Sequence, residues 1–128
     1  MKKVKEVESK LTYVDLHDLK ETVIDLIQSV APDVSEEDIQ AEINNRNKQG
    51  EGLMSQNSLS LHIQDKRIDC DTVIYLRISP SFDYYSNFFE QKFQISKLVL
   101  IIVNPNHQLN RLTKLTSFIT EESWESEN

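Results

Sequence analysis

The stretch KLVLIIV, residues 97–103, decides the fold of this 128-residue chain. After Lys97 its residues are apolar and mostly β-branched, without polar alternation, which is typical of a strand buried on both faces. The longest apolar run, Leu98 to Val103, has only six residues, whereas a membrane-spanning helix needs about 18. We therefore predict an interior strand at the centre of a sheet, covered by helices on each side.

Two amphipathic helices are expected before this strand. Residues 15–30 carry apolar side chains at intervals of three and four, which places them on one helical face: Leu16, Leu19, Val23, Ile24, Leu26, Ile27 and Val30. The helix-breaking sequence Ala-Pro-Asp at 31–33 ends this helix. Ser35 followed by three acidic residues is typical of a helix N-cap. A second helix is therefore predicted from Ser35 to about Lys48, with a thin apolar stripe on Ile39 and Ile43.

Two shorter strands are expected in the middle of the chain. From Ser58 to Gln64 apolar and polar residues alternate strictly, so the pattern predicts a strand with His62 on its polar face. Residues 72–79 alternate in the same way and predict a second strand, which we expect to neighbour the first. Residues 80–93 are aromatic and polar without a clear period, and they are predicted to form a loop with room for one helical turn.

The remaining segments complete a predicted single domain over residues 1–128. Residues 1 to about 12 are expected to be a frayed end or a short strand, and the acidic tail 122–128 to be disordered around an ordered core of about 12–121. After the turn at 104–106, leucines from Leu109 to Ile119 predict a third helix. The order α-α-β-β-β-α favours an α/β fold, in which a mixed β-sheet is flanked by helices.

Composition narrows the classes of function. The net charge of −7 opposes direct binding to nucleic acid or to anionic lipid, because both need Lys and Arg to neutralise phosphate. An acidic surface does suit docking to a basic protein. The N-terminus has no hydrophobic signal segment, and the single cysteine, Cys70, cannot form an internal disulfide, so we expect a cytoplasmic protein without membrane insertion.

Several catalytic and metal-binding motifs are missing from the sequence. The three histidines and one cysteine do not show the close spacing of metal ligands, so no metal is predicted. The chain has only two glycines and lacks a P-loop, a dinucleotide-binding pattern and a Gly-x-Ser-x-Gly elbow, so no cofactor is predicted. The acids Asp65, Asp69 and Asp71 are interpreted as a solvated turn between strands.

Arg46 and His62 form the one pattern that carries chemistry. Taken alone, a histidine on a strand is usually a surface residue, and an arginine late in an acidic helix usually complements the helix dipole. However, Arg46 precedes His62 by sixteen positions. This spacing, and the order of elements over 15–121, resembles the type-two enzyme IIA family of the fructose/mannitol class of bacterial sugar phosphotransferase systems. That family's motif runs from Arg-Glu through Ser-Thr and a Gly-containing turn to Ile-Ala-Ile-Pro-His, with the last histidine phosphorylated.

The chain departs from this motif at several positions. Leu61 replaces the proline before the histidine, Ile63 replaces the glycine after it, and the family's threonine falls at Gly52. The family's second histidine falls at Gln108, and His107 is one place too early. Loss of the threonine hydroxyl removes one donor for a phosphoryl group, although glycine lets backbone N–H approach closely.

The resemblance implies a phosphoryl relay. His62 would accept a phosphoryl group from phospho-HPr and pass it to an enzyme IIB, with Arg46 stabilising the charge and His107 or Gln108 lining the opposite side. His107 is otherwise interpreted as a helix-start residue. Two alternatives remain open: an enzyme IIA-like regulatory domain of a transcription regulator or antiterminator, and a degenerate module that only docks to a partner.

Overall fold

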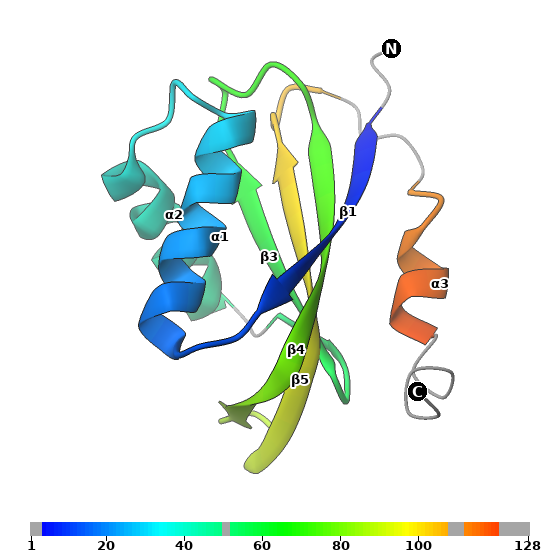
Figure 1. Ribbon diagram of the computed structural model, residues 1–128. Coiled ribbons are helices and arrows are strands. Elements are labelled where there is room, and N and C mark those ends of the chain that lie inside the picture. The colour runs from blue at the N-terminus through cyan, green and yellow to red at the C-terminus, as the bar shows by residue number, and fades with distance from the viewer. Residues whose placement is uncertain (1–3, 50–51, 108–111, 121–128) are drawn as a thin grey trace.

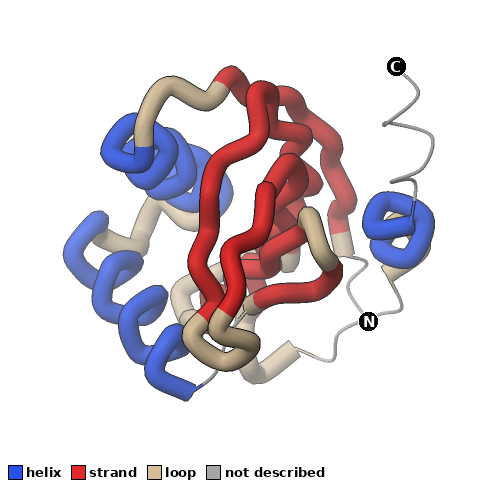
Figure 2. Tube along the Cα trace, turned by 90° about the horizontal axis from the view of Figure 1, so that it is seen from below, coloured by secondary structure: helices blue, strands red, loops and turns tan. Residues whose placement is uncertain are grey.

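The protein folds around one mixed β-sheet. The computed structural model describes residues 4–49, 52–107 and 112–120. Within those ranges, the strands are β1 (Lys5–Thr12), β2 (Leu53–Ser55), β3 (Ser58–Gln64), β4 (Thr72–Ser86) and β5 (Gln91–Val103), and the helices are α1 (Leu16–Val30), α2 (Glu36–Gln49) and α3 (Leu115–Thr120). Helices α1 and α2 cover one face and α3 lies on the other (Figures 1 and 2). The predicted α/β class, a mixed sheet flanked by helices, is confirmed.

Strand β5 is the centre of the sheet, as its apolar sequence predicts. The strand order is β1-β4-β5-β3-β2, and β5 pairs antiparallel with β4 and parallel with β3. Leu100 and Ile102 are fully buried in the core beneath α1 and α2, whereas Val99 is fully buried in the core beneath α3. This two-sided burial explains why the strand lacks alternation.

The first two helices form where their caps and apolar stripes predict. Asp15 caps α1 by accepting a hydrogen bond from the backbone N–H of Asp18 at 2.8 Å. Ser35 Oγ accepts in the same way from the N–H of Asp38 at 3.2 Å, at the start of α2. Ile39 is fully buried against the sheet. No helix among the described residues is long and apolar enough to span a membrane.

The predicted loop over residues 80–93 is wrong. Strand β4 continues through Pro80 to Ser86, and β5 begins at Gln91, so the two strands form a long hairpin in which Phe82 pairs with Ile95. The pairing register shifts between Arg77 and Phe82. This irregularity breaks the two-residue alternation around Pro80, and the sequence pattern therefore resembled a loop. Phe82 is nevertheless buried in the main core.

The predicted neighbourhood of strands 58–64 and 72–79 is also wrong. Strands β3 and β4 follow each other along the chain, but β5 lies between them in the sheet. They are therefore not hydrogen-bonded neighbours. Strand β1 pairs parallel with β4 along its whole length, and the short β2 pairs antiparallel with β3. Sequence alternation indicates which residues share a face, but it contains no information on which strands pair.

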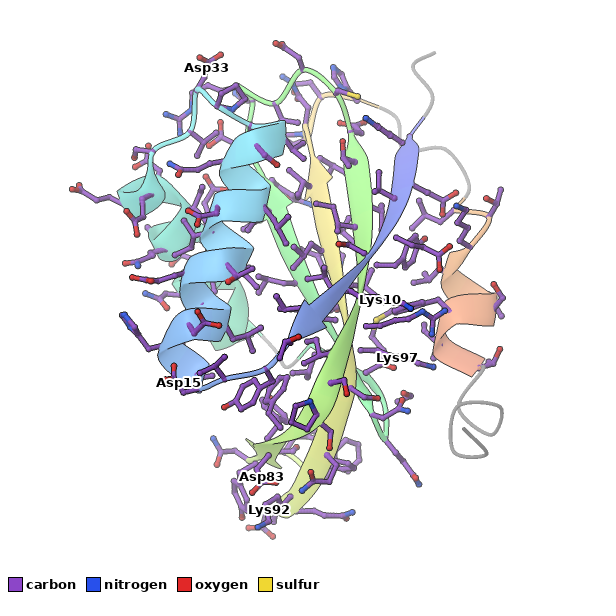
Figure 3. The ribbon with its side chains drawn as sticks, viewed as in Figure 1. Lys10, Asp15, Asp33, Asp83, Lys92 and Lys97 are labelled. Atoms are coloured by element: carbon purple, nitrogen blue, oxygen red, sulfur yellow. The ribbon has the colours of Figure 1, made fainter. Side chains whose placement is uncertain are left out.

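Helix α3 is shorter than predicted and begins later, at Leu115. The carboxylate of Glu6 holds the preceding segment, because it accepts hydrogen bonds from the N–H of Thr113 at 3.2 Å and of Lys114 at 3.1 Å. The buried Lys97 reaches from the sheet toward α3 (Figure 3), where its Nζ donates to the carbonyl of Phe118 at 2.7 Å. Leu109 and the tail 122–128 lie outside the described residues.

Candidate functional site

His62 lies on β3, next to the central strand. Its immediate neighbours Leu61 and Ile63 pack in the core beneath α1 and α2, so alternation directs His62 to the opposite face of the sheet. There it stands beside Ile101 of β5, which belongs to the core under α3. The histidine is half-buried. The predicted orientation, with His62 opposite the leucines of its strand, is therefore confirmed.

Gly52 occupies a position where a side chain would require the neighbouring backbone to shift. Its carbonyl accepts hydrogen bonds from the backbone N–H of Ser60 at 2.7 Å and from Ser60 Oγ at 3.2 Å. A Cβ atom on Gly52 would lie 2.1 Å from the carbonyl oxygen of Ser60. The family's threonine therefore cannot stand here without a shift of the chain, and the close backbone approach serves the pairing of this segment with β3.

The other two residues of the predicted motif are only partly described. The backbone at Arg46 is helical and belongs to α2, a helix that packs on the same core as Ile63 through Ile39 and Ile43. The side chain of Arg46 lies outside the described part of the structure, as does the whole of Gln108. Their predicted roles therefore stay predictions.

His107 lies in the turn after β5, and the described helix that follows it, α3, begins only at Leu115. Its backbone N–H donates to the carbonyl of Asn104 at 3.0 Å. Its ring atom Nδ1 lies 3.2 Å from Oδ1 of Asp71. The side chain of Asp71 is only 2% exposed, and Oδ1 also accepts a hydrogen bond from the N–H of Asn104 at 2.9 Å.

The two histidines are separated by the central strand. His62 stands on the β3 side of β5, whereas Asp71 immediately precedes β4 on the other side. Two strand spacings of about 4.8 Å put the backbones of these positions on the order of 10 Å apart across the sheet. A role for His107 in lining the His62 site remains a prediction.

A cluster of carboxylates beside α2 was missed by the sequence interpretation. The guanidinium of Arg67 donates to both oxygens of Asp65 at 2.8 Å and to Asp38 at 3.0 Å. These bonds from Arg67 hold the pKa of Asp65 below its usual range. Because Asp65 and Asp71 are 11% and 2% exposed, the interpretation of a solvated turn is wrong for both residues. The contact between Arg67 and Asp38 joins residues 29 positions apart, and no local pattern signals it.

Glu42 of α2 belongs to the same cluster. Burial raises the pKa of Glu42 to about 7, and its hydrogen bond with Asp65 and the negative charge of that residue contribute in the same direction. Its Oε1 atom is buried without a hydrogen-bond partner among the residues described. Protonation of Glu42 lowers the desolvation free energy of this partly buried carboxyl group, because the neutral form is less costly to remove from water than the charged form.

Comparison with known proteins defines the class of fold. No family model matches the chain, and no match was found among curated proteins. The fold is similar to the crystal structure of nitrogen regulatory protein IIA-Ntr from Neisseria meningitidis, with a TM-score of 0.60 and 15% sequence identity. The similarity covers 78% of this chain and 66% of that chain, slightly less than two thirds of its length. The protein therefore has an enzyme IIA-like fold.

Proposed function

We propose that this protein is a phosphohistidine carrier of the enzyme IIA type and that His62 is its phosphoryl acceptor. The observation that supports this function most is the position of His62. It is half-buried on the strand beside the centre of an enzyme IIA-like sheet, sixteen residues after Arg46. The donor is an HPr-like protein carrying phosphohistidine, and the acceptor is an enzyme IIB of a cytoplasmic relay that serves sugar uptake.

The chemistry needs no cofactor. A neutral ring nitrogen of His62 attacks the phosphorus of the donor's phosphohistidine, and the N–P bond of the donor breaks with its electron pair returning to the donor imidazole. Catalysis of such a transfer rests mainly on positioning and on stabilising charge at the phosphoryl oxygens. In this proposal Arg46 supplies that positive charge, and His107 or Gln108 lines the opposite side of the acceptor.

A regulatory domain is the second candidate function, and Gly52 favours it. Gly52 stands where the family motif has threonine, in close contact with Ser60, so the site lacks one hydroxyl donor for the phosphoryl group. Slow phosphorylation of His62 suits a domain whose phosphorylation sets the activity of a transcription regulator or antiterminator. A module that binds its partner without being phosphorylated is the limiting case of this candidate.

Peptide mapping after phosphorylation tests the proposal. The chain is incubated with phosphoenolpyruvate, enzyme I and HPr of the same organism and digested with trypsin at neutral to basic pH. The three histidines fall on separate tryptic peptides, residues 11–20, 49–66 and 98–111. We expect an acid-labile phosphate on peptide 49–66 that disappears in His62→Ala. The carrier function is contradicted if this peptide stays unmodified in the wild-type chain.

Arg46→Gln tests the second residue of the motif in the same reaction. Removal of one charged donor typically slows a transfer of this kind by about 100-fold or more. We therefore expect slower phosphorylation of peptide 49–66 and an unchanged thermal unfolding midpoint. A rate equal to that of the wild type would remove Arg46 from the site while leaving the assignment of His62 intact.

A further inference from the structure

His107 and Asp71 form a pair whose geometry the proposed function does not use. The ring atom Nδ1 of His107 lies 3.2 Å from Oδ1 of Asp71, at the upper end of the range of an N–H···O hydrogen bond. The histidine side chain keeps 26% of its surface exposed, whereas the aspartate keeps 2%. In this pair the carboxylate is therefore buried, whereas the imidazole is partly exposed.

The carboxylate is held in place by the turn that follows β5. Oδ1 of Asp71 accepts from the backbone N–H of Asn104 at 2.9 Å, and the side-chain amide of Asn104 donates to the carbonyls of Lys66 at 3.1 Å and Ile68 at 2.9 Å. Asn104 thus joins the loop before β4 to the end of β5. With its position fixed in this way, Asp71 orients the ring of His107.

This arrangement determines which ring nitrogen is reactive. A carboxylate beside Nδ1 favours the tautomer with its proton on Nδ1, which leaves the lone pair on Nε2. The same logic, a buried aspartate that orients the imidazole and stabilises the imidazolium formed during reaction, operates in catalytic triads.

His17 provides the contrast within this chain. It lies on α1 with 83% of its side chain exposed, and its Nε2 lies 3.2 Å from the exposed carboxylate of Glu21. Exposure alone therefore favours His17 as the more reactive histidine. Orientation by a buried carboxylate favours His107, so the two explanations predict opposite results.

We propose that His107 is a second phosphoryl acceptor, with Nε2 as the nucleophile and Asp71 as the positioning residue. Nε2 attacks the phosphorus of a phosphorylated nitrogen donor, a new N–P bond forms, and the donor's N–P bond breaks with its electron pair going to the donor nitrogen. The product is an imidazolium phosphorylated on Nε2, whose proton stays on Nδ1 against the carboxylate of Asp71. This inference deepens the proposed function and rests on it for the class of donor.

Phosphoramidate is the probe that separates this proposal from the function of His62. This small donor phosphorylates nucleophilic imidazoles without HPr, and the tryptic peptides 11–20 and 98–111 report His17 and His107 separately. We expect peptide 98–111 to be labelled faster than peptide 11–20. Asp71→Asn, which keeps an oxygen for the N–H of Asn104, should slow labelling of peptide 98–111 about tenfold or more and leave peptide 11–20 unchanged.

Long-range 1H–15N spectra of the histidine rings give a second readout for the same variant. We expect the Nδ1–H tautomer for His107 in the wild-type chain. Labelling of peptide 98–111 that is no faster than that of peptide 11–20, or that Asp71→Asn does not slow, overturns the proposal, as does an Nε2–H tautomer. If HPr fails to modify peptide 49–66 while phosphoramidate labels peptide 98–111, the carrier function fails and the reactivity of His107 stands.

Discussion

Glu6 in β1 binds Thr113 near the other end of the chain: its Oε2 accepts a hydrogen bond from Thr113 Oγ1 at 2.6 Å. Oε1 of the same carboxylate accepts from the hydroxyl of the fully buried Tyr75 at 2.6 Å and from the N–H of Lys114 at 3.1 Å. One side chain therefore ties the start of α3 to the sheet, and it explains why the helix begins after Lys114.

Glu6→Gln is expected to loosen α3. The substitution replaces a carboxylate that accepts four hydrogen bonds, and hydrogen bonds to a charged group contribute about 1.5 to 3 kcal/mol. We expect unfolding free energy to fall by about that amount and amide exchange in α3 to accelerate. Glu8→Gln is the control, since Glu8 is 49% exposed and pairs with Arg77 and Lys114 at the surface. Equal effects of both substitutions would contradict this role of Glu6.

The same carboxylate predicts acid sensitivity. Burial by itself raises the pKa of Glu6, but the hydrogen bonds from Thr113, Tyr75 and Lys114 outweigh it and lower the pKa from 4.5 to about 2. Because the pKa is lower in the folded state, this stabilisation is present above pH 4.5 and is lost as the pH falls toward 2. Glu6→Gln should therefore flatten the dependence of unfolding free energy on pH between 4.5 and 2. An unchanged slope would contradict the assignment.

Glu42 predicts the opposite dependence on pH. Its pKa is raised by burial from 4.5 to about 7, so the folded state binds this proton more tightly than the unfolded state. Glu42 therefore lowers stability progressively as the pH rises from 4.5 to 7. Glu42→Gln should remove that loss and make the protein more stable than the wild type at pH 8, as measured by urea unfolding. A less stable variant at pH 8 would contradict the raised pKa.

Gly52→Thr restores the threonine of the enzyme IIA motif and is expected to destabilise the protein. The added Cβ would lie 2.1 Å from the carbonyl oxygen of Ser60, and overpacking of this kind costs about 1 to 3 kcal/mol. Gln56→Thr is the control, because Gln56 is exposed in the turn between β2 and β3. Thermal unfolding midpoints that are equal for both variants would show that the chain relaxes at Gly52 without cost.

The β4–β5 hairpin offers a matched pair of phenylalanines. Phe82 is 7% exposed and its ring stacks on that of Tyr13 at a centroid distance of 5.2 Å, whereas Phe88 at the tip is 79% exposed. We expect Phe82→Ala to cost about 3 to 5 kcal/mol and Phe88→Ala to change stability by about 0.5 kcal/mol or less. Similar losses for both would contradict the described extension of β4 past Pro80.

Features that depend on local periodicity were predicted from the sequence. The two capped helices, the strand 58–64 with His62 opposite its leucines, and the central strand 97–103 all follow from patterns within a single segment. The fold class follows from their order. In each case one face or both faces of the helix or strand are buried, and the spacing of apolar residues in the sequence indicates this burial directly.

Features that depend on pairing between distant segments were not predicted. The placement of β5 between β3 and β4, the hairpin through Pro80 and the late start of α3 each result from contacts across the sheet. The same is true of the site region, where Asp71 meets His107 across 36 positions and Glu42 meets Asp65. Such pairs of polar residues leave no periodic trace in the sequence.

Phosphoryl transfer from phospho-HPr to His62 in a single turnover tests the central claim most directly. Phospho-HPr carrying 32P is mixed in excess with the chain, and label on tryptic peptide 49–66, which contains His62 as its only histidine, is followed over time. The proposed carrier function predicts label that rises on this peptide, is lost on acid treatment and is absent in His62→Ala. A peptide 49–66 that stays unlabelled while phospho-HPr remains intact would contradict it.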